Sequence, residues 1–194
     1  MGEDGLSLSL CSQEGLGMMG KPPHFESRFH GLYGTFDYSF VSNINHTEFN
    51  DDYALKGFVC SLGWQWRHQS AVGVGFSYLR DPMGSFSQIP VFLEFRSHYV
   101  RRRVTPYTNI EVGWTYPFGS VNNGRNYVKI NKGGVEFGVT AGFRIALNRR
   151  EGIHIGGGYQ MLMLNEVERG MNNIAVYKLP CLYHNTRISF GINF

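Results

Sequence analysis

Two residue types used in nucleophilic catalysis stand close together in the stretch His68–Gln69–Ser70. A serine hydroxyl becomes a good nucleophile when a histidine within hydrogen-bond reach takes its proton and an acidic group orients that histidine. His68 and Ser70 are therefore candidate catalytic residues. The alternative interpretation is an ordinary polar turn, because polar residues of these types are common in short turns.

A second group of polar residues lies nearer the N-terminus. Ser42, His46, Asp51 and Asp52 supply the residue types of another serine, histidine and acid arrangement. Glu48, together with the two aspartates, offers carboxylate oxygens of the kind that bind a divalent cation. A solvated acidic loop is the interpretation that we favour for this segment.

No cofactor or metal site is predicted elsewhere in the chain. Cys11, Cys60 and Cys181 are far apart and lack the paired spacing of a zinc site. The glycines of Gly73–Val74–Gly75 are not followed by a helical pattern, so they do not form a phosphate-binding loop. The formal net charge of +3 is too small to argue for a nucleic-acid partner.

The composition favours a single all-β domain. The chain has 194 residues, of which 15% are aromatic and 25 are glycine. No stretch approaches the roughly 20 consecutive apolar residues of a membrane-spanning helix. The N-terminus has neither the basic segment nor the apolar run of a signal peptide, so we expect that any leader is missing from this sequence.

Apolar and polar residues alternate with a period of two in eight stretches after residue 29. These stretches are 32–40, 58–67, 72–78, 89–96, 109–116, 135–145, 153–163 and 187–194. Strict alternation of this kind is typical of β-strands with two different faces. The connections are alternately short (68–70, 101–103, 148–151) and long (42–53, 80–88, 117–132, 165–180). Together these features predict an up-and-down antiparallel barrel with all its long loops at one end.

The identity of the polar residues indicates which face lies inside. They are mostly small residues with scattered Arg and Glu, and we find no Lys within the expected strands. Small side chains suit the narrow interior of an eight-stranded barrel, whereas a solvated strand face would use Lys freely. Several aromatic residues fall near strand ends, as an interfacial girdle would require. These are Trp64, Trp66, Tyr78, Trp114 and Tyr116. The pattern therefore predicts a membrane barrel with its apolar face turned to lipid.

Equal numbers of acids and arginines, four of each, are expected inside this barrel. The predicted interior network contains Asp37, Glu94, Glu111, Glu136, Arg67, Arg96, Arg144, Arg187 and His154, with Gln160 beside them. Opposite charges would neutralise one another there, because an unpaired charge in a low-dielectric interior is costly. We expect Asp37 to pair with Arg187 across the closing seam, and Arg96 to reach Glu111 or Asn109. The interior is predicted to be a packed polar plug.

The last strand carries the most specific motif. Ile188, Phe190, Ile192 and Phe194 alternate with polar or small residues up to the final position. This ending resembles the assembly signal of the small eight-stranded outer-membrane β-barrels of Gram-negative bacteria, the X-, W- and A-type proteins. The resemblance covers residues 29–194 at the level of architecture. It implies an outer-membrane location, contact with membrane lipid and lipopolysaccharide, and recognition by the barrel assembly machinery. Residues 1–28 are expected to form a periplasmic tail or a segment at the barrel mouth.

Three functional hypotheses remain open at this point. The first is a barrel without enzymatic activity that acts through its long loops or as a subunit of an envelope assembly. The second is a lipid-modifying enzyme, since His68–Gln69–Ser70 resembles the His-x-Ser of lipid A deacylases and the segment 42–52 offers the residues of an acyltransferase. The turn at His68 is expected on the periplasmic side, which is the wrong side for outer-leaflet lipid A. The third is a narrow conduit for small hydrophobic molecules.

Overall fold

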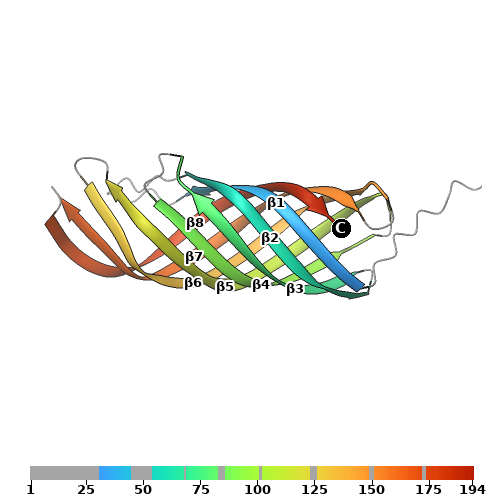
Figure 1. Cartoon of the computed structure of the whole chain (residues 1–194), viewed down its shortest axis with the longest axis horizontal. Helices are drawn as coiled ribbons and strands as arrows, with labels where there is room; N and C mark the ends of the chain where they lie inside the picture. Colours follow the sequence, from blue (N-terminus) through green and yellow to red (C-terminus); the bar gives the residue numbers. More distant parts are fainter. Residues whose placement is uncertain are drawn as a thin grey trace, which may run out of the picture.

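The chain folds into a closed barrel of eight antiparallel strands (Figure 1). The computed structural model describes residues 31–44, 54–67, 69–82, 86–100, 102–122, 126–148, 151–171 and 174–194, with the backbone alone at 67, 120–122, 126–131, 165–171, 174–179 and 181. The strands are β1 (Gly31–Asn43), β2 (Ala54–Arg67), β3 (Ser70–Arg80), β4 (Phe86–His98), β5 (Val104–Asn122), β6 (Asn126–Ala146), β7 (Gly152–Met171) and β8 (Ile174–Asn193). This confirms the predicted eight-stranded up-and-down architecture.

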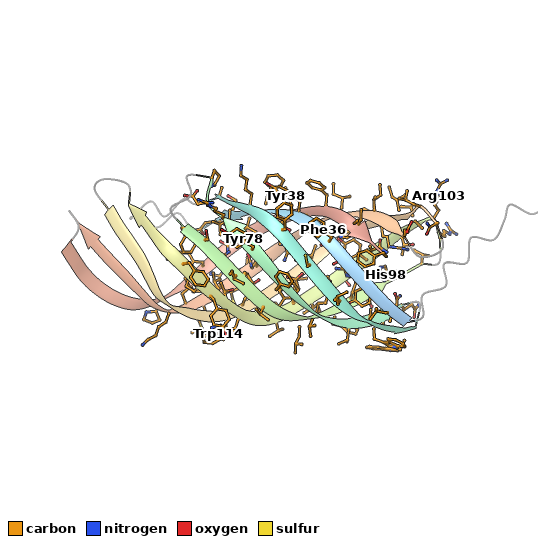
Figure 2. The ribbon with its side chains drawn as sticks, viewed as in Figure 1. Phe36, Tyr38, Tyr78, His98, Arg103 and Trp114 are labelled. Atoms are coloured by element: carbon orange, nitrogen blue, oxygen red, sulfur yellow. The ribbon has the colours of Figure 1, made fainter. Side chains whose placement is uncertain are left out.

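Side chains alternate between the interior and the outer wall along every strand. Leu62, Leu93 and Ile155 point outward and are 56%, 63% and 57% exposed. Their neighbours in sequence point inward, and Glu94 is 3% exposed. Figure 2 shows Trp114 projecting from the outside of the barrel wall. Period-two alternation is a property of the extended backbone itself, so the sequence pattern translates directly into an apolar outer wall.

The barrel closes where β1 meets β8. Tyr38 is paired with Phe190 and Asp37 with Gly191. The backbone amide of Gly34 donates to the carbonyl of Phe194 at 2.8 Å, and the amide of Phe194 donates to the carbonyl of Gly34 at 3.0 Å. Closure leaves no unpaired strand edge along this seam, which satisfies the backbone polar groups internally.

Two of the predicted loops are instead strands. The segments 117–132 and 165–180 largely continue β5 to β8, and the pairs Val121–Val128 and Glu168–Lys178 still lie opposite each other. Figure 1 shows β5 to β8 reaching beyond the other strands at the end opposite the C-terminus. The sequence of these extensions lacks the regular apolar alternation of the other strands, while the backbone ladder continues.

The interior is not polar throughout. Val41, Leu55, Leu79 and Phe86 form a buried apolar cluster. They come from β1 to β4, close to the connections between β1 and β2 and between β3 and β4, which we call the loop end of the barrel. The opposite end, with the connections near residues 68, 101 and 149, is called the turn end. Within the described residues no helix is long and apolar enough to span a membrane.

Candidate functional site

The barrel interior holds a network of buried charged and polar side chains, and Glu94 of β4 lies at its centre. Tyr33 donates its hydroxyl proton to Oε1 of Glu94 at 2.5 Å, and Ser61 donates to the same atom at 2.7 Å. Asn109 and Arg96 donate to Oε2 at 3.2 and 3.3 Å. A carboxylate that accepts four donors from four strands is well solvated by the protein, which is the condition for burying it.

A second carboxylate, Glu111 of β5, accepts a bond from the far side of the barrel. Arg187 of β8 donates from Nη1 to Oε2 of Glu111 at 2.6 Å, and Asn109 donates to Oε1 at 2.8 Å. The Nε of Arg187 also donates to the hydroxyl of Ser39 at 3.3 Å. Because β5 and β8 are not adjacent strands, this charge-assisted bond crosses the lumen.

The predicted pairing of Asp37 with Arg187 is wrong. The two strands meet as expected, but Asp37 lies opposite Gly191 and Arg187 lies opposite Val41. The two residues are therefore four positions apart along the seam, and their ion pairs go to His154 and Glu111 instead. The alternation of a strand leaves this offset undetermined, because shifting it by two residues preserves the faces.

Asp37 instead contacts a histidine. The Nε2 of His154, on β7, lies 2.8 Å from Oδ1 of Asp37. Gly191 of β8 stands between them, opposite Asp37 on one side and opposite His154 on the other. Both side chains are almost fully buried. The contact is an ion pair when the imidazole is protonated.

Glu136 is held by neutral donors. Thr115 donates its hydroxyl to Oε2, and Gln160 donates its amide to Oε1 at 2.6 Å. Asn185 extends the chain of bonds by donating to Gln160 at 3.5 Å. Glu136 is 1% exposed, and none of the ion pairs seen among the described residues involves it. The predicted balance of four acids against four bases therefore does not describe this part of the interior.

Arg96 was predicted to reach Glu111 or Asn109. It stands directly opposite Asn109 in the register of β4 and β5, as the hairpin requires. Its hydrogen bond, however, goes to Glu94, and its guanidinium lies 5.6 Å from the ring centroid of Tyr107. A cation over an aromatic face is stabilised by the ring quadrupole.

The remaining bases lie towards the turn end. Arg144 is 2% exposed and donates from Nε to the side-chain oxygen of Asn193 at 2.8 Å. His98, also buried, lies in the same part of the barrel, and Figure 2 shows it near the turn end with Arg103 beyond it. The side chain of Arg67 lies outside the described residues.

The candidate catalytic residues are only partly described. Ser70 is half-buried at the start of β3, but His68 lies outside the described residues, so their mutual geometry stays a prediction. Ser42 is exposed on the outer wall at the loop end, and its backbone carbonyl accepts a bond from Thr186 at 3.4 Å. The possible loop partners at 46–52 also lie outside the described part of the chain. In that part no group of three or more metal-ligating side chains occurs.

The residues of the proposed assembly signal share the outer face of β8 and its end. They are exposed to similar degrees, between 50% and 58%. They are Ile188, Phe190, Ile192 and Phe194. Phe190 packs beside Tyr38 of β1, with ring centroids 5.7 Å apart.

Two features of the structure were missed by the sequence analysis. Lys56 and Arg80 lie within β2 and β3, on the outer wall, although no Lys was expected in a strand. The second expected strand began at 58 and the third ended at 78, so Lys56 and Arg80 each lie two residues outside the expected strands. Gln88 was also missed: it is fully buried, and neither its side-chain nitrogen nor its oxygen bonds to any described residue.

Solved structures of other proteins share this fold, although no family model and no curated protein matches the sequence. Neisserial surface protein A has a TM-score of 0.57 and 12% identity, with 84% of this chain and 96% of that one covered. OprG from Pseudomonas aeruginosa has a TM-score of 0.58 and 11% identity over 88% and 99% of the two chains. The N-terminal barrel domain of OprF from the same organism has a TM-score of 0.51 and 12% identity over 85% and 98%. The fold is therefore that of small outer-membrane barrels, and the narrower X-, W- and A-type resemblance stays a prediction.

Proposed function

We propose that this chain is an integral β-barrel of the outer membrane of a Gram-negative bacterium, and that it acts through its loop end or as a subunit of an envelope assembly. The observation that carries the proposal is the distribution of polarity. The outer wall exposes large apolar side chains, while Glu94, Arg96, Glu111 and Arg187 are buried inside. In water, charged side chains would be expected outside and apolar ones inside. A lipid environment favours the observed arrangement, with the apolar side chains outside.

A plugged interior is part of the proposal. Arg187 and Glu111 join β8 to β5, and Tyr33 and Glu94 join β1 to β4, so bonded side chains span the lumen in two directions. An eight-stranded barrel has an interior just wide enough for its side chains. The apolar cluster around Phe86 adds a second obstruction nearer the loop end. These contacts support a barrel that does not conduct ions.

The extended hairpins support a role at the loop end. β5 pairs with β6, and β7 pairs with β8, beyond the ends of the other strands, so these hairpins extend past the rest of the barrel. Paired strands that project in this way suit contact with a partner better than catalysis at the wall. The enzyme hypothesis depends on residues outside the described ranges, and it stays a hypothesis.

Two measurements test the proposal together. The chain, produced with an export leader in a Gram-negative host, is expected in the outer-membrane fraction, where it should migrate faster on a detergent gel before heating than after. Purified protein in planar bilayers should give no steady conductance. A chain that remains in the periplasm would contradict the membrane assignment, and steady conductance would contradict the plug. Mass spectrometry of lipid A from cells with and without the gene would expose a lipid-modifying activity.

A further inference from the structure

Two basic side chains stand side by side on the outer wall at the loop end. Lys56 of β2 and Arg80 of β3 are direct cross-strand partners, and both are exposed. Like charges in this position destabilise a sheet. Among the described residues, neither side chain has a hydrogen-bond or ion-pair partner. In the described part of the chain no carboxylate is paired with either base, so both remain available to an anion from outside the chain.

The two cations border a cavity of about 480 Å³ on the outer wall. Arg80 ends its strand, and the next residue, Asp81, donates its backbone amide to the carbonyl of Phe86 at 2.9 Å, which closes the turn beside the cavity. The carboxylate of Asp81 and the ring of Pro82 complete the rim. The two bases and one acid leave this rim with one net positive charge.

An aromatic row lies directly below the cations, towards the middle of the barrel. Tyr38, Phe58 and Tyr78 are cross-strand neighbours on β1, β2 and β3. Phe58 and Tyr78 are two residues further from the loop end than Lys56 and Arg80, and so point to the same outer face. Tyr38 and Phe58 contact edge to face, with centroids 5.3 Å apart, and all three rings line the same cavity. Figure 2 labels Tyr38 and Tyr78 on this part of the barrel. The cavity is thus positively charged at its upper edge and apolar at its lower edge.

We propose that Lys56 and Arg80 bind the phosphate of a phosphorylated glycolipid in the leaflet at the loop end, whose acyl chains lie on Tyr38, Phe58 and Tyr78. Arginine and lysine are the residues that bind phosphate, and the arginine fork does so with two parallel bonds. Aromatic rings sit at the boundary between head groups and acyl chains. Free phosphate could bind to Lys56 and Arg80 in the same way, but it would make no use of the aromatic row. This inference rests on the proposed membrane location.

The test uses the refolded full-length chain in detergent, with diphosphorylated lipid A as the probe and native mass spectrometry to count retained lipid. The variant Lys56→Ser with Arg80→Ser is compared with Arg102→Ser with Arg103→Ser, which removes two exposed charges at the turn end. We expect the first variant to bind lipid A at least about ten-fold more weakly, because a lost charge-assisted contact commonly changes affinity by that factor. The second variant should bind as the unmodified chain does. Lys56→Arg, which keeps the charge, should also retain binding.

Three further comparisons separate the possible outcomes. Chemically dephosphorylated lipid A should bind weakly to every variant, and inorganic phosphate should not displace lipid A. Equal retention by the two double variants would overturn the inference, and so would displacement by inorganic phosphate at concentrations near that of the lipid. Heat-dependent gel migration verifies that each variant is folded. Failure of the unmodified chain to insert into lipid bilayers would instead contradict the proposed function, so the two failures are distinguishable.

Discussion

Asp37 of β1 and His154 of β7 touch across an intervening strand, with Oδ1 and Nε2 2.8 Å apart. The strand between them is β8, and its residue at this level is Gly191, paired with Asp37 on one side and with His154 on the other. A side chain at position 191 would point into the space that the contact occupies. Because Gly191 has no side chain, β1 and β7 can be linked across β8 near the closing seam.

Gly191→Ala should destabilise the barrel. An added Cβ would lie 2.2 Å from Oδ1 of Asp37 and 2.4 Å from the carbonyl oxygen of Phe36. Overpacking of this kind commonly costs about 1–3 kcal/mol, and the urea midpoint of the refolded barrel measures it. Gly138→Ala is the matched control, since its nearest atom, on Glu111, would be at an ordinary 3.5 Å. Equal midpoints for the two variants would contradict the geometry of this contact.

Glu111 and Arg187 should behave as a coupled pair. Arg187→Met leaves the buried carboxylate without its cation, which commonly costs about 3–5 kcal/mol. Glu111→Gln combined with Arg187→Met should cost less than the sum of the two single changes. The urea midpoints of all four proteins give the coupling energy. The corresponding cycle between Asp37 and Arg187 should give a smaller coupling; a larger one would mean that the register of the seam differs from this structure.

Gln88→Leu should stabilise the barrel. The amide of Gln88 is fully buried beside Leu79, and neither of its polar atoms bonds to a described residue. Burying an amide without hydrogen bonds costs about 1–3 kcal/mol, and leucine at this position avoids that cost. Gln160→Leu should do the opposite, because it removes a donor to the buried carboxyl of Glu136. Chemical denaturation of both variants supplies the comparison. A loss of stability in Gln88→Leu would indicate that this amide has a partner outside the described residues.

Val139→Arg and Ile155→Arg should destabilise the barrel in a bilayer. Both residues point outward, 37% and 57% exposed, and an arginine on the lipid face near the membrane midplane costs roughly 2–4 kcal/mol. The conservative changes Val139→Ile and Ile155→Leu serve as controls. Unfolding titrations in lipid vesicles report the difference. If both arginines leave the midpoint unchanged, these positions do not face lipid.

Opposite ends of the barrel should differ in their accessibility from outside the cell. Pro82→Cys places a thiol at the loop end and Arg102→Cys places one at the turn end, and both positions are exposed. With the three native cysteines changed to serine, a membrane-impermeant maleimide should label intact cells at position 82 and leave position 102 unlabelled. Broken cells should show both. Labelling of position 102 alone in intact cells would reverse the orientation.

The extended hairpins mark a limit of reading strands from polarity. Residues 117–132 and 165–180 were expected as loops because their sequence is polar and lacks the apolar alternation of the other strands. The backbone ladder between Val121 and Val128 nevertheless continues the sheet. Hydrogen bonds between adjacent backbones do not depend on which face is apolar, so this pairing has no signature in the alternation.

The sequence by itself determined the architecture of this barrel and the inward or outward direction of its side chains. Leu93 and Glu94 point to opposite sides because successive residues of a strand must do so, whatever the rest of the chain does. Only the tertiary structure decided which inward side chains meet. Arg187 bonds to Glu111 and Asp37 lies beside His154 because the offset between strands, and the curvature of the closed wall, set their heights and distances across the lumen. Those quantities belong to the closed sheet as a whole, and no local stretch of residues encodes them.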